Sequence, residues 1–375
     1  MLKQLLLLFF IFPSFCFAQV LITGKIINAD DKKPVANASV FLNNAIVGDK
    51  TADDGTFTLR NVKPGQYTFI VTAVGFETHS ITLMAGTANI ALPEISLAPK
   101  TIMLQEVNIK PDPNRQRNYD DFKRLFLGTS ANAAQCKILN PDVVDVDFDS
   151  KKMVLSASSR DDFIEVENKA LGYLIKYKLT AFSYDAKHMF YYEGVSVFQE
   201  LKGSKGQQRK WQKNRMVAYL GSSMHFLRSV ISGQTDKDGF EVLRLVRKPN
   251  PNYKEGRMGA NNYKYNQSLY TKPALTPADF SHPTDQPGLF AIGFTDCLYV
   301  IFKNKRVETD LSVYHPIEVP NYPVTILAFD ELYAFFDHNG IITNPHSVIF
   351  EGDWGASRVA EMLPVDYEPE KANGK

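Results

Sequence analysis

The chain has 375 residues, of which 44% are hydrophobic and 22% are charged. This composition is typical of globular proteins, and the length is sufficient for two or three domains that each bury a core. The 42 Lys and Arg residues nearly balance the 41 Asp and Glu residues, which excludes a global electrostatic attraction to nucleic acid or to an anionic membrane. A partner of either kind would need a local patch of charge.

The N-terminal segment has the pattern of a cleaved secretory signal. Lys3 precedes an apolar run over residues 5–12, and the small-residue end Cys16-Phe17-Ala18 stands before Gln19. This pattern predicts a signal peptide over residues 1–18. The apolar run is too short to cross a bilayer, and no later stretch of about 18 uncharged apolar residues follows, so the mature chain is expected to lack a transmembrane segment.

The three cysteines have different expected fates. Lipid attachment at Cys16 is disfavoured, because Phe15 stands where a lipoprotein signal needs a small residue. Cys136 and Cys297 would lie in a compartment that permits disulfides, but two thiols cannot build a disulfide scaffold. Two interpretations stay open: the two pair with each other, or each lies buried as a small apolar residue. We favour the second.

Residues 20–97 alternate short apolar runs with clusters of turn residues. Short strands at this spacing predict an antiparallel sandwich of about seven strands over residues 19–99. Asp54-Gly55 and Pro64-Gly65 are expected to form the tight turns between strands. The carboxylates of Asp53 and Asp54 do not predict a calcium site, since a calcium loop spreads its ligands over about a dozen residues.

A set of strand and turn residues in this segment matches the pattern of a known family. They are Gly24, residues 34–40, Thr51, residues 54–57, Leu59, residues 64–67, Gly75 and Phe76. On these residues the segment resembles the carboxypeptidase-regulatory-like domain, a transthyretin-like or immunoglobulin-like sandwich; Ala52 departs from the family, which often has Asp there. The resemblance implies a non-catalytic domain of the kind common at the N-termini of outer-membrane receptors and surface proteins of Bacteroidetes.

A second region is expected to follow a linker. Residues 100–118 have little apolar periodicity and predict that linker, which leads to an α+β region over residues 119–375. Asn118 is expected to cap a first helix. Apolar residues with period two over residues 143–202 predict antiparallel sheet. Apolar residues that recur at three and four predict one long helix over residues 211–233, ended by a glycine.

The remainder of the second region is less regular. Residues 249–287 are rich in Asn, Tyr and Pro, which predicts either a functional excursion or a flexible insertion. Strands are expected again from residue 290, with a hairpin at His338-Asn339-Gly340 and a short terminal helix near residues 356–363. Residues 122–367 resemble the uncharacterised portion that follows such sandwich domains in Bacteroidetes proteins, and this resemblance implies no activity.

His315 and Glu318 are the strongest candidates for chemistry, because a His and a Glu three residues apart begin the zinc site of metallocarboxypeptidases. A catalytic zinc needs three protein ligands and a water, and no histidine of this chain stands at the family's distance downstream. Motifs for other nucleophiles and for phosphate loops are absent, and the apolar neighbours of Cys136 predict burial of its thiol. The sequence therefore predicts no catalytic, cofactor-binding or metal-binding residues.

Residues 202–215 hold the densest basic run of the chain. It comprises Lys202, Lys205, Arg209, Lys210, Lys213 and Arg215 around Trp211. We favour a solvated loop that leads into a helix. The alternative is a contact with anionic glycan or lipid headgroups, with the Trp211 indole stacked on a sugar ring.

Taken in order, these features predict an exported, non-enzymatic protein of the bacterial envelope with a binding or assembly role. It would lie in the periplasm or at the outer membrane, or be secreted, and its expected partner is an envelope protein or a glycan, with no nucleic acid. The alternative is a hydrolase with an unrecognised site in the second region. A deep pocket with converging His, Asp or Glu would favour the hydrolase, and a shallow surface beside a sheet edge would favour the binding protein.

The mature protein is expected to begin at Gln19, because the Cys16-Phe17-Ala18 boundary fits the cleavage pattern of a secretory signal. Intact-mass measurement of exported material checks this. A diacylglycerol adduct on Cys16 would contradict it and would place the protein on a lipid anchor.

Overall fold

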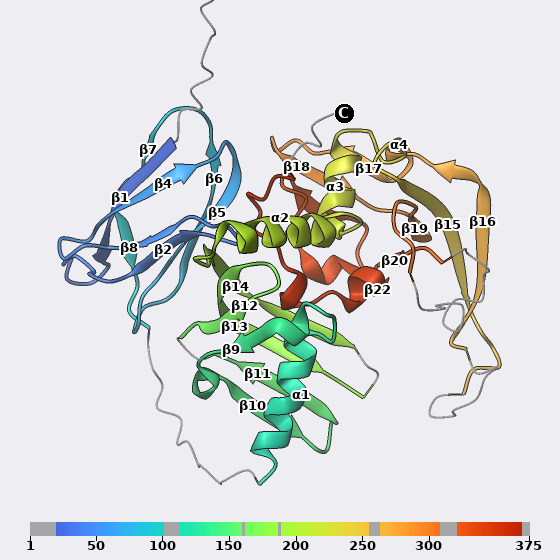
Figure 1. Ribbon diagram of the computed structural model, residues 1–375, viewed down its shortest axis with the longest axis horizontal. Helices are drawn as coiled ribbons and strands as arrows, with labels where there is room; N and C mark the ends of the chain where they lie inside the picture. The colour runs from blue at the N-terminus through green and yellow to red at the C-terminus, as the bar shows by residue number, and fades with distance from the viewer. Residues whose placement is uncertain are drawn as a thin grey trace, which may run out of the picture.

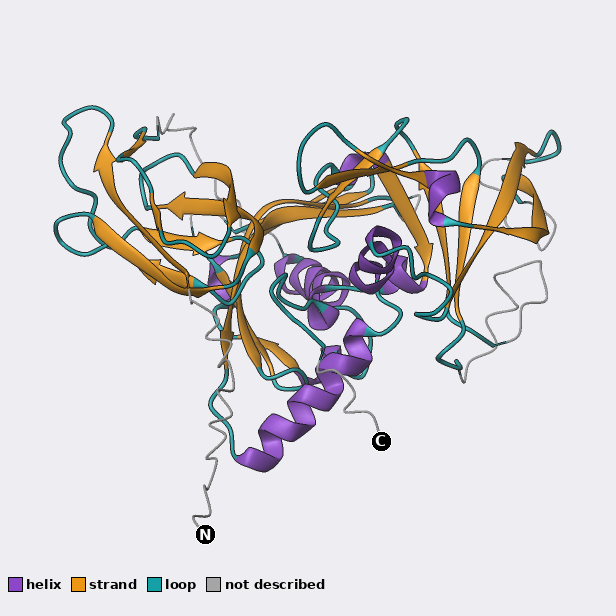
Figure 2. Cartoon of the chain, turned by 90° about the horizontal axis from the view of Figure 1, so that it is seen from above, coloured by secondary structure: helices purple, strands orange, loops and turns teal. Residues whose placement is uncertain are grey.

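A computed structural model describes residues 20–100, 113–159, 162–186, 189–254, 263–307 and 321–369. The fold is mainly β, as the sequence predicts, with an N-terminal sandwich followed by a larger region of antiparallel sheets and helices (Figure 1). The helices lie between the sandwich and the five-stranded sheet at the opposite end of the molecule (Figure 2). No helix among the described residues is long and apolar enough to cross a membrane.

The sandwich has two four-stranded sheets. One has the order β4-β1-β7 with β8 also on β1, and the other has the order β3-β2-β5-β6. The strands are β1 (Val20–Asn28), β2 (Ser39–Leu42), β3 (Gly48–Lys50), β4 (Thr56–Val62), β5 (Gly65–Thr72), β6 (His79–Ala85), β7 (Ile90–Ala91) and β8 (Ile95–Leu97). The described strands number eight against the seven expected, and β7 and β8 run parallel to β1. Alternation of side chains buries Val40 and Phe69 between the sheets.

The Asp54-Gly55 turn shows why these residues stand between β3 and β4. Gly55 has a φ of +79°, and a Cβ at this position would lie 2.4 Å from the Ile26 carbonyl oxygen, so a larger residue is excluded sterically. The Asp54 carboxylate accepts hydrogen bonds from the backbone N–H and the hydroxyl of Thr56, at 3.0 and 2.6 Å. Both residues serve the turn itself.

The first half of the second region is a six-stranded sheet covered by one helix. The sheet order is β10-β11-β13-β12-β9, with β14 on the other edge of β13. Its elements are α1 (Arg115–Leu127), β9 (Cys136–Ile138), β10 (Asp145–Asp149), β11 (Val154–Ser158), β12 (Ile164–Asn168), β13 (Tyr173–Tyr184) and β14 (Phe190–Glu200). Phe122 of α1 packs edge-on against Phe182 of β13, with ring centroids 5.0 Å apart, and this contact joins the helix to the sheet.

The start of α1 corrects two sequence predictions. The N-cap is Asn114 rather than Asn118, and the helix therefore extends into the predicted linker. Asn118 lies inside the helix and is buried. The apolar stripe of the helix begins only at Tyr119, so the polar first turn gave no periodic signal.

The second half contains two further sheets, with orders β16-β15-β19-β20-β22 and β17-β18-β21. Its strands are β15 (Phe240–Pro249), β16 (Tyr265–Leu275), β17 (Ser281–Pro283), β18 (Leu289–Ile292), β19 (Cys297–Phe302), β20 (Val324–Phe329), β21 (Ala334–Asp337) and β22 (Val348–Gly352). Its short helices are α4 (Pro277–Phe280) and α5 (Asp353–Ala356), and α5 with a 3-10 turn at Val359–Glu361 replaces the expected terminal helix. Phe226, Phe280 and Trp354 lie in its core.

The prediction of a functional excursion or a flexible insertion over residues 249–287 is wrong for residues 265–283. Strand β16, helix α4 and strand β17 lie within it. Strand β16 is the outer strand of its sheet, and most of its residues are exposed on both faces. An exposed edge strand needs no alternation of apolar and polar residues, so its sequence resembles a loop.

The predicted long helix is two helices, α2 (Lys205–Tyr219) and α3 (Ser223–Ile231). Gly221 interrupts them with a φ of +83°, and a Cβ there would lie 2.6 Å from the Phe302 ring. The indole Nε1 of Trp354 donates to the Gly221 carbonyl oxygen at 2.7 Å. Ser222 then begins α3 by accepting from the His225 N–H at 3.2 Å. The apolar periodicity of the sequence continues across the break, whereas the helical conformation of the backbone does not.

The sandwich is attached to the second region through residues 43–46, which we call the joint loop. The Asn44 N–H donates to the Ser196 carbonyl oxygen at 2.7 Å, and the Phe198 N–H donates to the Ala45 carbonyl oxygen at 2.8 Å. Ala45 and Val197 thereby form a parallel bridge at the outer edge of β14. The joint loop thus extends the six-stranded sheet by a short backbone pairing.

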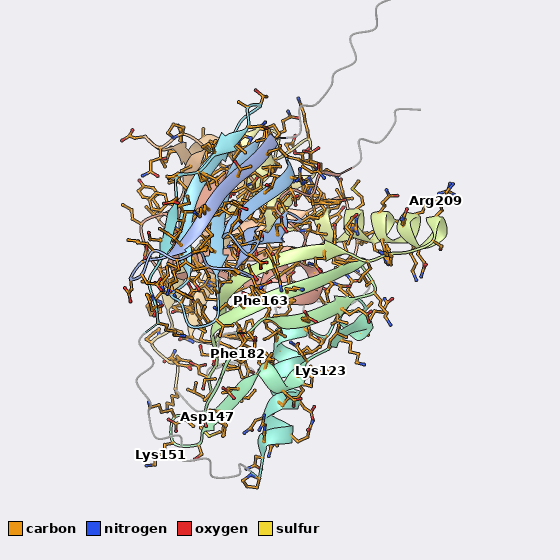
Figure 3. The ribbon with its side chains drawn as sticks, turned by 90° about the vertical axis from the view of Figure 1, so that its left-hand side faces the viewer. Lys123, Asp147, Lys151, Phe163, Phe182 and Arg209 are labelled. Atoms are coloured by element: carbon orange, nitrogen blue, oxygen red, sulfur yellow. The ribbon has the colours of Figure 1, made fainter. Side chains whose placement is uncertain are left out.

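An apolar contact lies beside this pairing. Phe41 and Ile70 face outward from the sandwich and are buried against Val197, with Phe163 packed on Phe41 at a ring-centroid distance of 5.8 Å (Figure 3 labels Phe163). In a free sandwich these two side chains would be exposed. The contact therefore contributes hydrophobic stabilisation that exists only when the two parts are docked.

Cys136 and Cys297 are both free thiols in the structure. They lie on different sheets, on β9 and β19. Burial raises the pKa of Cys136 to about 12 and also raises the pKa of Cys297. The two thiols are therefore not paired with each other; Cys297 is buried, as expected, whereas Cys136 is half-buried.

The predicted boundary of the sandwich can be tested together with its docking contact. In the full chain, Phe41→Thr with Ile70→Thr is expected to lower the free energy of unfolding by more than about 3 kcal/mol, because large buried side chains are lost. In the fragment of residues 19–99, the same two substitutions should change the free energy of unfolding by less than about 0.5 kcal/mol, because both side chains are exposed there. Chemical denaturation followed by circular dichroism measures both.

The matched control is Phe69→Ala, which removes a side chain from the inner core of the sandwich and should destabilise the fragment and the full chain alike. Equal effects of the Phe41 and Ile70 pair in both contexts would contradict the docking contact. A fragment that remains unfolded would contradict the predicted boundary.

Candidate functional site

A cavity of about 360 Å³ lies where four parts of the chain meet. The sandwich contributes Lys63 and Tyr67, helix α3 contributes Arg228, the hairpin after β21 contributes His338, and residues 365–368 close the remaining side. We call it the joint cavity. Its size is within the range of small-molecule sites, which occur preferentially between domains.

Arg228 fixes the wall of the joint cavity. Its guanidinium donates to three carbonyl oxygens: Asn339 at 2.8 Å, Tyr367 at 2.9 Å and Val365 at 2.8 Å. Helix α3 positions the side chain, because it is held at its N-terminus by Ser222 and packs its apolar face on the core. The planar guanidinium holds its donors in fixed, widely spread directions, so one Arg can bond to three acceptors that lie apart.

The hairpin after β21 reaches from the second region to the sandwich. The Asp337 carboxylate accepts from the N–H groups of Asn339 and Ile341, both at 2.9 Å, and so closes the turn that the sequence predicts at residues 338–340. Asn339 Nδ2 donates to the Gln66 carbonyl oxygen at 2.6 Å. Burial raises the pKa of Asp337, although these hydrogen bonds favour its ionised form.

Residues 365–368 close the cavity beside the joint loop. The Val365 N–H donates to the Asn44 carbonyl oxygen at 2.6 Å, and the Ile46 N–H donates to Asp366 Oδ1 at 3.3 Å. Lys63 Nζ donates to the Asp366 carbonyl oxygen at 2.9 Å. Burial raises the pKa of Asp366. Burial and the nearby Asp366 also raise the pKa of Tyr67, whose hydroxyl therefore stays protonated at neutral pH.

The hydroxyl of the serine in the cavity wall is already engaged. Ser232 lies in the wall, but its hydroxyl donates to the Ser229 carbonyl oxygen at 3.2 Å rather than to His338. Within the described ranges, no group of three or more His, Cys, Asp and Glu side chains is arranged to hold a metal ion. What the cavity offers is a set of hydrogen-bonding groups.

The structure separates the residues singled out in the sequence. His315 and Glu318 lie outside the described residues, so the zinc interpretation is not addressed by the structure. Cys136 lies in the six-stranded sheet, apart from the residues that line the joint cavity. Of the sequence motifs, only the Pro64-Gly65 turn and the hairpin at residues 338–340 border the cavity, and both were predicted as turns.

The basic run corrects the predicted start of the helix, because α2 begins at Lys205 and not at Trp211. Trp211 is buried, and its indole Nε1 donates to the Lys169 carbonyl oxygen at 2.9 Å. The indole is therefore not available to stack on a sugar. Arg215 is also occupied, since it pairs with Glu200 at 2.7 Å and lies 3.9 Å from the centre of the Tyr173 ring.

Sequence reasoning missed Arg228 and Asp366, which hold the cavity together. Their partners lie more than a hundred positions away along the chain, at Asn339 and at Ile46. No local pattern marks a residue for such contacts. Only the Asn339-Gly340 turn signal pointed to this part of the chain.

Comparison with known proteins gives a family match for the sandwich. The family described as CarboxypepD_reg-like domain matches residues 22–109. The N-terminal sandwich is a CarboxypepD_reg-like domain. The match is to a regulatory-like domain and covers about a quarter of the chain, so the larger region lies outside the CarboxypepD_reg-like domain. A search of curated proteins finds no match.

Three solved structures illustrate the remaining similarity. A pilus 2b backbone protein of group B streptococcus is 18% identical with a TM-score of 0.19, over 22% of this chain and 42% of its own length. A putative carbohydrate binding protein from Bacteroides uniformis is 8% identical with a TM-score of 0.19, over 89% and 98%. A putative membrane-associated protein of unknown function from Bacteroides fragilis is 9% identical with a TM-score of 0.18, over 89% and 94%.

The half-buried carboxyl of Asp366 gives the stability a defined pH dependence. Its pKa is raised on folding, so its ionisation destabilises the folded state as pH rises above 3.8, the ordinary value. Asp366→Asn keeps an acceptor for the Ile46 N–H and removes the charge. The variant should therefore gain stability relative to the natural protein as pH rises from below 3.8 to neutral, as measured by urea unfolding at several pH values.

Asp54→Asn is the control with the opposite sign. Hydrogen bonds from Thr56 lower the pKa of Asp54, so its ionised form stabilises the folded state above pH 3.8 and this contribution is lost on acidification. Asp54→Asn should lose stability relative to the natural protein at neutral pH. Identical pH profiles for Asp366→Asn and the natural protein would show that Asp366 is solvated in the folded state.

Proposed function

We propose that the chain is an exported, non-enzymatic binding protein of the bacterial envelope that takes up a short saccharide in the joint cavity. The observation that carries the proposal is the joint cavity itself, because four separate parts of the chain converge on it. The predicted signal peptide and the CarboxypepD_reg-like domain support an address in the periplasm or at the outer membrane of a Bacteroidetes cell.

The chemistry of the cavity lining supports a saccharide. Sugars present many hydroxyl groups that both donate and accept hydrogen bonds. Tyr67 lines the cavity but is only 4% exposed and packs its ring in the sandwich core, so it offers its hydroxyl and not a ring face. The lining also includes His338 and Glu368. The described part of the chain provides no hydrogen-bond partner for the hydroxyl of Tyr67 or for the imidazole of His338. These groups remain for a ligand.

The groups that hold the cavity are distinct from those that would contact a ligand. Arg228, Asp337 and Asn339 are engaged with backbone atoms of neighbouring segments. They act as positioning residues, because they fix where the sandwich lies relative to α3. A cavity with preformed walls binds a small ligand without the entropy cost of ordering them.

Tyr67→Phe tests the proposal, because it removes one hydroxyl from the cavity and keeps the ring. The mature chain is screened against saccharides released from envelope polysaccharides, and the dissociation constant of each saccharide that binds is measured by calorimetry. Loss of one hydrogen bond of about 1.4 kcal/mol should raise the dissociation constant about tenfold. Tyr270→Phe is the matched control, since Tyr270 lies exposed on β16, and should leave binding unchanged.

Two outcomes would contradict the proposal. Saccharide binding that is equal in the natural protein and in Tyr67→Phe would place the ligand elsewhere. Turnover of an envelope glycan, abolished by His338→Ala, would show that the cavity is the site of the alternative hydrolase.

A further inference from the structure

Helix α2 carries a row of basic side chains that the proposed function does not use. Lys205, Arg209 and Lys213 recur every four residues and therefore lie on one face of the helix. All three are exposed, as are Lys202 and Lys210 beside them. The helix contains no Asp or Glu. The described part of the chain provides no ion pair for any of these five side chains.

The opposite face of α2 is fixed to the six-stranded sheet. Three side chains donate to three successive carbonyl oxygens after β12: Trp211 to Lys169 at 2.9 Å, Asn214 to Ala170 at 2.8 Å and Arg215 to Leu171 at 2.8 Å. These bonds also satisfy backbone acceptors that the sheet leaves unpaired. The helix is thus held in one orientation, with the basic row turned away from the sheet.

The N-terminal part of α2 projects from the body of the protein, with Arg209 near its end (Figure 3). The basic row continues into an exposed apolar residue, because Val217 follows Lys213 at the same spacing and is 54% exposed. Leu220, which ends the helix, is 40% exposed. A projecting helix with cations followed by aliphatic side chains suits a flat anionic surface with an apolar layer beneath it.

We propose that helix α2 docks the protein on an anionic lipid surface, with Lys205, Arg209 and Lys213 at the headgroup phosphates and Val217 and Leu220 at the acyl boundary. Charge complementarity carries this choice of partner. The chain as a whole has a formal net charge of only +1, so the attraction is local to α2 and reaches no further than about a Debye length. The projecting, convex form of the helix fits a planar surface better than the pocket of a protein.

Vesicle binding of the mature chain tests the proposal. The natural protein should sediment with vesicles that contain phosphatidylglycerol and remain in solution with vesicles of phosphatidylcholine alone. Each basic side chain near an anionic surface contributes about fivefold to partitioning, so the triple variant Lys205→Glu, Arg209→Glu and Lys213→Glu should lose at least about 100-fold. Binding of the natural protein should also fall as salt rises from about 0.1 M to about 1 M.

The matched control carries the same change in charge at other exposed lysines: Lys50→Glu, Lys123→Glu and Lys151→Glu. It should bind the anionic vesicles at least 10-fold better than the α2 variant. Tyr67→Phe should bind vesicles as the natural protein does, so failure of the saccharide proposal would leave this one standing. Unfolding temperatures of the variants check that the exposed substitutions leave the fold intact.

Three results would overturn the proposal. In the first, the natural protein stays in solution with anionic vesicles. In the second, the α2 variant and the control lose binding equally. In the third, the natural protein binds a soluble anionic polysaccharide and does not bind the vesicles. The last result would assign the basic row to a glycan partner.

Discussion

The backbone pairing between the joint loop and strand β14 is the constraint on which the arrangement of this protein depends. Asn44 and Ala45 bond to Ser196 and Phe198, and so a loop of the sandwich covers the outer edge of a sheet in the second region. An uncovered edge would present unpaired backbone groups to other chains. The pairing covers residues 196–198 of this edge and at the same time orients the CarboxypepD_reg-like domain.

Other contacts follow from this orientation. Once the joint loop is placed, the Asn44 carbonyl can accept from Val365, and the hairpin can reach Gln66. Arg228 then ties the hairpin to the C-terminal segment. The joint cavity is the space that these segments enclose. The half-buried carboxyl of Asp366 carries a desolvation cost at neutral pH, which the surrounding backbone hydrogen bonds partly offset.

The sequence predicted those features that depend on local chemistry. Turn residues marked the Asp54-Gly55 and His338-Gly340 turns, and alternation marked the sandwich, because each signal lies within a few residues. Strand β16 was missed because an edge strand does not need a buried face. The break at Gly221 was missed because the apolar periodicity runs across it and because the bond from Trp354 that holds it comes from far along the chain. The joint cavity depends wholly on long-range contacts, so no window of sequence could indicate it.

Amide hydrogen exchange of Asn44 and Phe198 in the mature protein measures the central pairing directly, because each N–H donates across the junction at 2.7 to 2.8 Å. If the sandwich and the second region are joined as described, both amides should exchange far more slowly than amides of an exposed loop, at the rate set by separation of the two parts. Exchange at the rate of an exposed loop, while β1 and β13 stay protected, would show that the sandwich moves freely and that the joint cavity is not a fixed site.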